Sequence, residues 1–245
     1  MYIGSNLIGS IGWGISAVIT AIILLILNRA YLKGKDERLK YLMGFVGFRL
    51  ILFSSAALAP AVYFLSKNLL LTGVFSSLTY ASIFLSLIFP PLLFTSFKLP
   101  KLKKYYFGAL VVVAAISVVI IAINFQPAVY FFETGIVSQF APDYLLKILY
   151  PLAKILSIFP LVILFLFYAL RETGWLRYRS LLIGLGFLWV VTTIIVPTLI
   201  PAPWGGMYCC VGDVLIVAGF LIRPEKKSNK WISGFKNKTT LLKEK

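Results

Sequence analysis

Seven long apolar runs constrain this 245-residue chain more than any other feature of its sequence. A bilayer core of about 30 Å is crossed by roughly 20 apolar residues in a helix. Because backbone polar groups in lipid must be bonded within the protein, such runs are expected to cross as helices. The seven runs cover residues 6–28, 41–66, 69–97, 105–124, 145–170, 180–200 and 206–222. The sequence therefore predicts an all-α membrane protein, with a seven-transmembrane-helix bundle over residues 1–222.

The composition agrees with lipid as the main surroundings of the chain. Hydrophobic residues make up 60% of it and charged residues only 13%, whereas a soluble domain carries about a quarter charged residues. In a soluble protein the net charge of +16 would indicate a nucleic-acid partner. Here the positive residues lie in blocks between the apolar runs, so we expect membrane topology to explain the charge and expect no nucleic acid.

The residue types that carry most metal and catalytic chemistry are scarce. The sequence has no histidine, and its two cysteines, Cys209 and Cys210, are adjacent and cannot form a thiolate metal cage alone. Adjacent cysteines could form a redox pair, but small packing residues in a helix are the simpler interpretation. No Walker loop or GxSxG nucleophile motif is present. We therefore expect no metal, no cofactor and no enzymatic activity.

Basic residues concentrate in alternate connections between the runs. By the positive-inside rule these connections face the cytoplasm, which places the N-terminus outside the cell and the C-terminus inside. We expect a multi-pass protein of the plasma (inner) membrane. The four basic segments carry Arg29, Lys33, Lys35, Arg38 and Lys40; Lys98, Lys101, Lys103 and Lys104; Arg171, Arg177 and Arg179; and Arg223 with seven lysines.

Two further segments lie outside the apolar runs. The tail at 223–245 mixes lysines with apolar residues, so it is expected to be drawn to anionic lipid of the inner leaflet. It is too short to be an output domain, so any signal must pass through a partner protein. The outer segment at 125–144 is expected to form a short helix at the bilayer surface, or alternatively a lid over a pocket.

An internal repeat is indicated by two similar segments that lie 139 positions apart. The segment "RLKYLMGFVGF" at 38–48 aligns with "RYRSLLIGLGF" at 177–187, so that Gly47 meets Gly186. The pattern predicts two parallel three-helix repeats joined by a fourth span, a 3+1+3 plan. Alternatively, any two basic loops followed by helices rich in leucine and glycine would look alike.

Three ionisable residues lie well inside the runs: Arg49, Lys154 and Asp213. A charge at the centre of a membrane helix costs about 2.5–3.5 kcal/mol, so such residues face the bundle interior and mark function. Lys154 and Asp213 fall at similar depth, which predicts that Asp213 pairs with Lys154, with Arg49 as the alternative partner. A static pair that only holds helices together is the competing interpretation.

Proline residues around these charges predict irregular helices. Pro151 and Pro160 bracket Lys154, and a proline within a helix leaves a carbonyl without its usual donor. Irregular helices near buried charges fit a cavity or a moving part better than an inert bundle. The other prolines within runs are Pro60, Pro90, Pro91 and Pro197.

The two basic loops and the number of runs resemble the heptahelical membrane-sensor regions at the N-termini of bacterial and archaeal histidine kinases. The relevant segments are "YLKGKDERLKYLMGFVGF" and "LRETGWLRYRSLLIGLGF". The topology is also similar to that of microbial rhodopsins, but their retinal lysine belongs in the middle of the last helix, where this chain has Asp213. The resemblance implies a sensor, and the kinase that follows it in that family is missing here.

We therefore expect a receptor-like or sensor-like protein that binds a small or lipid-like ligand in a polar-centred pocket between helices and acts through a partner. Asp213, Lys154 and Arg49 are the expected ligand-binding or gating residues. One alternative is a small secondary transporter gated by an intramembrane Lys–Asp pair. A second alternative is a structural subunit of a membrane protein complex.

Overall fold

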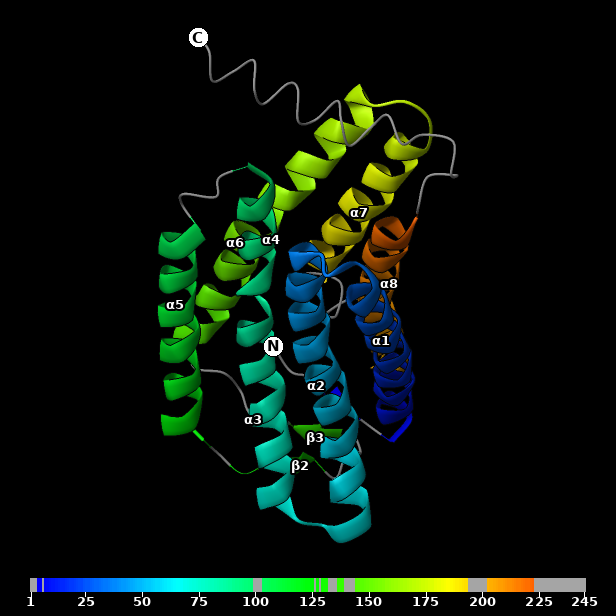
Figure 1. Ribbon diagram of the computed structural model, residues 1–245. Helices are drawn as coiled ribbons and strands as arrows, with labels where there is room; N and C mark the ends of the chain where they lie inside the picture. The colour runs from blue at the N-terminus through cyan, green and yellow to red at the C-terminus, as the bar shows by residue number, and fades with distance from the viewer. Residues whose placement is uncertain are drawn as a thin grey trace.

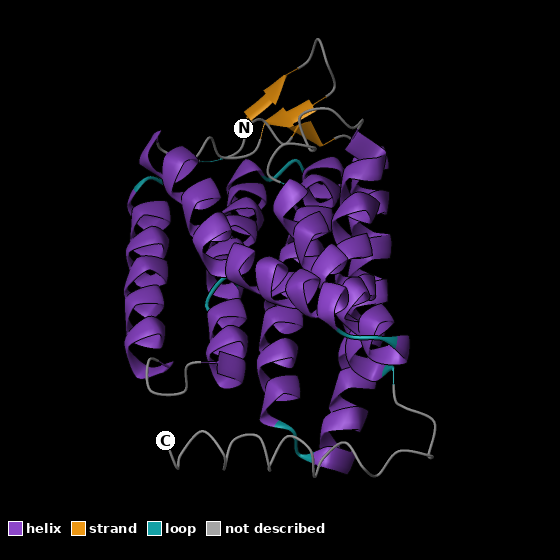
Figure 2. Cartoon of the chain, turned by 90° about the horizontal axis from the view of Figure 1, so that it is seen from above, coloured by secondary structure: helices purple, strands orange, loops and turns teal. Residues whose placement is uncertain are grey.

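The computed structural model describes residues 4–5, 7–98, 103–125, 127, 129–131, 136–138, 144–193 and 202–222. In those residues eight helices form a bundle, and three short strands form a sheet at one end of it (Figures 1 and 2). The helices are α1 (Leu7–Gly34), α2 (Glu37–Ser66), α3 (Leu69–Ser86), α4 (Phe89–Lys98), α5 (Lys103–Ile123), α6 (Tyr144–Arg171), α7 (Gly174–Thr192) and α8 (Ala202–Leu221). The strands are β1 (Gly4–Ser5), β2 (Val129–Phe131) and β3 (Ile136–Ser138).

Five helical stretches among the described residues are long and apolar enough to cross a membrane. They lie in α1, α2, α6 and α8, and in α3 together with α4. The apolar part of α5, Phe107–Ile123, is shorter, and the first two turns of α7 carry Arg177 and Arg179. The prediction of a helical multi-pass membrane protein therefore holds, while the structure supports five of the seven expected spans on these criteria.

Six of the eight described helices form two rows of three. In one row α2 packs against both α1 and α3, and in the other α7 packs against both α6 and α8. The rows meet where α1 packs against α8, and α4 contacts α2, α5 and α6 (Figure 1). This shared pattern fits the proposed repeat, but the environments of Gly47 and Gly186 differ, because only Gly186 packs against another helix. The repeat stays a prediction.

Tight turns make neighbouring helices antiparallel. Between α1 and α2, Lys35 has a left-handed φ of 48°, and Asp36 caps α2 by accepting from the Arg38 backbone N–H at 2.9 Å. The Arg38 guanidinium also lies 2.6 Å from the Asp36 carboxylate. Partial burial alone would raise the pKa of Asp36, but its hydrogen bonds and attraction to Arg38 hold that pKa below the usual value. This capped turn fixes where α2 enters the bundle.

Proline interrupts the third apolar run and leaves the others continuous. α3 ends at Ser86 and α4 begins at Phe89, directly before Pro90 and Pro91, so the expected break there is confirmed. Breaks expected at three other prolines are wrong, because Pro60, Pro151 and Pro160 lie inside unbroken helices. A single proline removes one hydrogen bond, and the remaining bonds of a long helix preserve it. Pro197 lies outside the described residues.

A small antiparallel sheet replaces the helix expected in the outer segment. β3 lies between β1 and β2, and β2 pairs with β3 from Val129↔Ser138 to Phe131↔Ile136. The prediction of a surface helix is therefore wrong for these residues. Valine, isoleucine, tyrosine and phenylalanine favour strands, and pairing with the N-terminal β1 supplies the partner that a two-stranded hairpin would lack.

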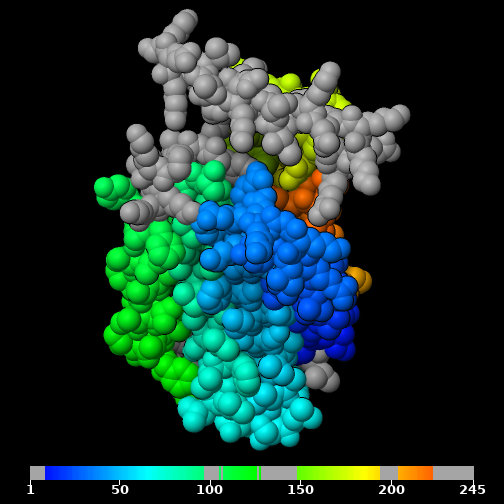
Figure 3. Space-filling view, in the orientation of Figure 1, coloured from blue at the N-terminus to red at the C-terminus, as the bar shows by residue number. Residues whose placement is uncertain are grey.

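The outer surface of the bundle is apolar, and its interior contains the charges. Side chains of α5 such as Val112, Ile116 and Val119 are at least half exposed, and α5 lies along one side of the bundle (green in Figure 3). A soluble protein rarely exposes a contiguous apolar face of this kind. In contrast, Arg49, Lys154 and Asp213 are all buried, so the bundle has the inside-polar arrangement of a protein in lipid.

Close packing of α7 on α8 yields a first prediction. A methyl group on Gly186 would lie 2.8 Å from the Ile216 backbone nitrogen and 2.9 Å from the Gly212 carbonyl oxygen. Because α8 cannot approach α7 as closely, we expect Gly186→Ala to lower the free energy of unfolding by about 1–3 kcal/mol. Titration with denaturing detergent in micelles measures the change. Gly47→Ala is the matched control, since nothing lies within 4 Å of its methyl position, and equal effects of the two variants would contradict the prediction.

Candidate functional site

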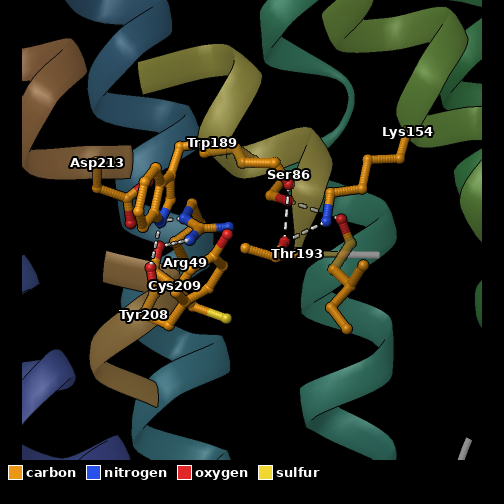
Figure 4. A network of polar contacts seen from close by, with 10 residues as sticks. Arg49, Ser86, Lys154, Trp189, Thr193, Tyr208, Cys209 and Asp213 are labelled. Atoms are coloured by element: carbon orange, nitrogen blue, oxygen red, sulfur yellow. Dashed lines mark hydrogen bonds and ion pairs between the residues drawn. The ribbon is translucent and has the colours of Figure 1, made fainter. Parts of the chain in front are cut away.

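The buried carboxylate of Asp213 on α8 pairs with Arg49 on α2 (Figure 4). The Arg49 Nε atom donates to Asp213 Oδ2 at 2.6 Å, and Arg49 Nη2 donates to the Cys209 carbonyl at 2.7 Å. The Arg49 guanidinium also lies over the rings of Phe45 and Phe53, 5.5 and 5.0 Å from their centroids. Two hydrogen bonds and two aromatic faces thus hold a cation that is 6% exposed.

The expected Lys154–Asp213 pair does not form in this structure, and the alternative partner, Arg49, takes its place. The similar depth of the three residues along their helices brings them into one region, but depth does not determine the direction in which a side chain points. Helix order does not decide the partner, because α7 packs against both α6 and α8, and α1 packs against both α2 and α8. The direction of the side chains decides it, since Arg49 on α2 points toward Asp213 (Figure 4).

Lys154 is held by hydroxyl groups. Its Nζ atom donates to Thr193 Oγ1 at 2.5 Å and to the Tyr150 hydroxyl at 3.0 Å. The ammonium also lies 5.2 Å from the centroid of the Tyr150 ring. Lys154 is 3% exposed, and it is close enough to Arg49 and Asp213 to interact with their charges. Among the described residues it has no carboxylate within ion-pair distance.

Two helix ends lie beside Lys154. Thr193 follows the last residue of α7, and Figure 4 shows Ser86, the last residue of α3, next to the lysine ammonium. The C-terminal end of a helix carries partial negative charge from carbonyls without intrahelical donors. Pro90 adds to this at α3, because it has no N–H for the carbonyl of Ser86. The two ends therefore stabilise a cation without supplying a full counter-charge.

The interruption between α3 and α4 is bonded to α6. Pro91 cannot donate to the Leu87 carbonyl, and Ser157 Oγ on α6 donates to that oxygen at 2.5 Å instead. Ser157 is 1% exposed, so water does not compete for the bond. Ser157 lies one turn after Lys154 on α6. Its bond to Leu87 therefore links the break between α3 and α4 to the helix that carries the lysine.

The Ser157 contact gives a second prediction. Ser157→Ala leaves the buried Leu87 carbonyl without a donor, and we expect it to lower the free energy of unfolding by about 1–3 kcal/mol. Pro91→Ala restores a backbone N–H at the position that normally serves this carbonyl. The double variant should therefore lose less stability than the sum of the two single variants, as measured by unfolding in detergent micelles. Strict additivity would show that Ser157 does not replace the missing donor.

One oxygen of the central carboxylate is unsatisfied. Asp213 Oδ1 is buried and has no hydrogen-bond partner among the described residues, although Oδ2 is bonded to Arg49. A buried acceptor without a donor is costly and calls for an explanation. Nearby, Trp189 Nε1 donates to the Tyr208 carbonyl at 2.8 Å, and the two rings lie 4.6 Å apart. These contacts join α7 and α8 beside the carboxylate (Figure 4).

Several residues of this site were missed in the sequence. Thr193, Tyr150 and Trp189 are ordinary residues of apolar helices, and no spacing pattern distinguishes them from packing residues or interfacial anchors. Tyr150 lies four positions before Lys154, which places both on one helix face and is the one signal that was available. Cys209 and Cys210 are free and buried, which agrees with their interpretation as packing residues.

An apolar crevice lies beside the charged site, between α2, α4 and α7. It is too narrow to admit a water molecule. Phe45, which stacks on Arg49, lies on its wall together with Phe187 and Pro90. The polar-centred pocket expected between the halves stays a prediction, because the charges are buried and the indentation beside them is lined by apolar side chains. The basic tail at 223–245 lies outside the described part of the chain.

Fold and site together define a class, a helical multi-pass membrane protein with a charged cluster in its core. The chain matches no protein-family model and no curated protein.

Proposed function

We propose that the chain is a receptor-like membrane protein that binds a small ligand at the buried charges and acts through a partner protein. The single observation that carries this proposal is Lys154, a buried cation that hydroxyls hold beside the ends of α3 and α7 without a described counter-charge. A purely structural lysine would be expected to have a carboxylate partner, because an unpaired buried charge is costly. A ligand would supply the missing interaction.

The position of the cluster supports the same function. Arg49 comes from one row of helices, and Asp213 and Lys154 come from the other. A ligand that binds between the rows would change how they pack, and such a change can be passed to a partner. The resemblance of the basic loops to heptahelical sensor regions points in the same direction.

The topology proposed with this function has seven spans, with the N-terminus outside and the C-terminus in the cytoplasm of a plasma (inner) membrane. It is supported by the alternation of basic connections. The basic tail would then lie against anionic lipid. Reporter fusions after Lys67 and after Lys245 test it: the first is expected to be active only outside the cell and the second only inside. Activity of both on the same side would contradict the topology.

A secondary transporter is the second candidate, and the break between α3 and α4 specifically favours it. Transporters bind substrates at interrupted helices, where free carbonyls and helix ends face the site. A gate formed by a Lys154–Asp213 pair would then require Asp213 to leave Arg49 and bind Lys154 in a second state of the transporter. Uptake of substrate into liposomes would favour the transporter, and binding without uptake would favour the receptor.

The test of ligand binding begins with the purified protein in lipid nanodiscs. Native mass spectrometry is expected to show a retained small molecule, and Lys154→Met is expected to lose it. Lys67→Met is a matched control. Lys67 caps the C-terminal end of α2, 18 residues after Arg49, and its ammonium lies over the Tyr63 ring. Stable protein without any retained small molecule, together with co-purification of other subunits in fixed proportion, would instead identify a structural subunit.

A further inference from the structure

The buried cluster carries an uncompensated positive charge. Arg49 and Asp213 form an ion pair, with Nε and Oδ2 2.6 Å apart, so their charges cancel. Lys154 brings a second cation and, among the described residues, has no carboxylate within ion-pair distance. The three residues together therefore have one net positive charge, and all three are buried. An uncompensated charge is costly in such surroundings.

Unused hydrogen-bond donors indicate the same need. Of the three N–H donors of the Lys154 ammonium, two serve Thr193 Oγ1 and the Tyr150 hydroxyl. That hydroxyl accepts from the lysine, and its own proton has no acceptor among the described residues. Arg49 has five N–H donors; Asp213 Oδ2 and a backbone carbonyl of α8 use two of them, so three have no described acceptor. Asp213 Oδ1 is the opposite case, an acceptor without a described donor. The cluster thus lacks acceptors more than donors.

The groups that surround Lys154 do not supply a full negative charge. Thr193 donates its own proton to the Val190 carbonyl at 2.7 Å, and Ser86 donates its proton to the Ile83 carbonyl at 2.7 Å. These hydroxyls are neutral, and Thr193 takes part at Lys154 only as an acceptor. The Asp213 carboxylate is bonded to Arg49 instead. A bound anion would supply the charge and the acceptor that the ammonium lacks.

An anion would bind on the Lys154 side of the cluster. The Asp213 carboxylate repels it, whereas the free N–H of Lys154 and the O–H of Tyr150 attract it. Figure 4 shows the side chains of Arg49 and Lys154 extending toward each other with Thr193 between them, so the charge of Arg49 adds to the attraction. One negative charge neutralises the cluster, and two would leave it negative. Because Lys154 is only 3% exposed, a small anion requires the least repacking.

We propose that the ligand is a small monovalent anion that binds the Lys154 ammonium and the Tyr150 hydroxyl. This inference rests on the proposed ligand-binding function and names the chemical class of its ligand. Two sources supply this chemistry, namely a halide such as chloride and a short carboxylate such as formate or acetate. Both carry one negative charge and accept hydrogen bonds without donating any at neutral pH.

The experiment measures the thermal unfolding midpoint in phosphatidylcholine nanodiscs at constant ionic strength. Sodium gluconate, whose anion is large, is replaced stepwise by sodium chloride, bromide, formate, acetate or sulfate. Each series is repeated with Lys154→Met, because salts change the stability of proteins in general. At ten times its dissociation constant, an anion that binds is expected to raise the wild-type midpoint by about 3–6 °C more than that of Lys154→Met.

Two further variants locate the anion. Tyr150→Phe keeps the ring that lies beside the ammonium, 5.2 Å from its centroid, and removes the O–H donor. It is expected to raise the dissociation constant about tenfold, and an unchanged constant would overturn the position beside Tyr150. Lys67→Met should respond to each anion as the wild type does. If Lys154→Met does not fold, the dissociation constant of Tyr150→Phe carries the test.

The remaining outcomes separate this inference from the function on which it rests. A larger site-specific rise with halides than with carboxylates identifies halides as the source, and the reverse order identifies carboxylates. Equal midpoint changes in the wild type and in Lys154→Met would reveal a general salt effect and overturn the inference. A site-specific rise with sulfate as large as that with chloride or acetate would overturn the single charge. No site-specific rise, while mass spectrometry still shows a retained small molecule, would overturn the inference alone. Absence of both would reject the proposed function as well.

Discussion

Asp213→Asn is expected to be the most damaging single substitution in the protein, lowering the free energy of unfolding by about 3–5 kcal/mol. The carboxylate is fully buried and is the partner of Arg49 at 2.6 Å. Asparagine has nearly the same shape, so the loss would come from leaving the Arg49 guanidinium without its counter-charge in an apolar interior. Reversible unfolding in detergent micelles measures the effect.

Arg49 supplies the control for this prediction. Arg49→Met removes the cation, and the double variant Arg49→Met/Asp213→Asn leaves neither charge uncompensated. The double variant is therefore expected to be milder than the sum of the single variants by about 0.5–3 kcal/mol. Combining Asp213→Asn with Lys154→Met should show a smaller coupling, because those residues do not form an ion pair. The reverse order of couplings would show that Asp213 pairs with Lys154.

Lys154→Met is expected to have the opposite sign, raising the free energy of unfolding by about 1–3 kcal/mol in the ligand-free protein. Lys154 is 3% exposed and has no described carboxylate partner, so its replacement removes an ionised group from an apolar interior. Methionine fills similar space. The Thr193 hydroxyl keeps its bond to the Val190 carbonyl, at 2.7 Å.

The same unfolding measurement checks this second prediction. Lys154→Arg is the matched control, because it keeps the charge and should not stabilise the protein. A loss of stability with Lys154→Met as large as that with Asp213→Asn would show that the ammonium has a structural counter-charge in the chain. A gain would identify Lys154 as a residue retained at a cost to stability, which is typical of functional sites.

The sequence could predict the charged residues of the site but not the hydroxyl residues that bind them. Arg49, Lys154 and Asp213 were predictable because a charge within an apolar run is rare and visible in one dimension. Thr193 and Tyr150 were not, since a hydroxyl in a membrane helix is common and most often bonds to its own helix. The Ser157 bond to Leu87 was also invisible, because it joins residues that are 70 positions apart.

The sequence by itself determined that apolar helices form, that the third apolar run breaks at Pro90 and Pro91, and that three charges lie inside the bundle. These properties follow from the order of apolar, charged and proline residues along the chain. Only the tertiary structure decided that Asp213 pairs with Arg49 and that Lys154 is left to hydroxyls. The physical reason is that partner choice depends on the rotation of each helix about its axis and on the helix packed beside it, and depth along the chain contains neither.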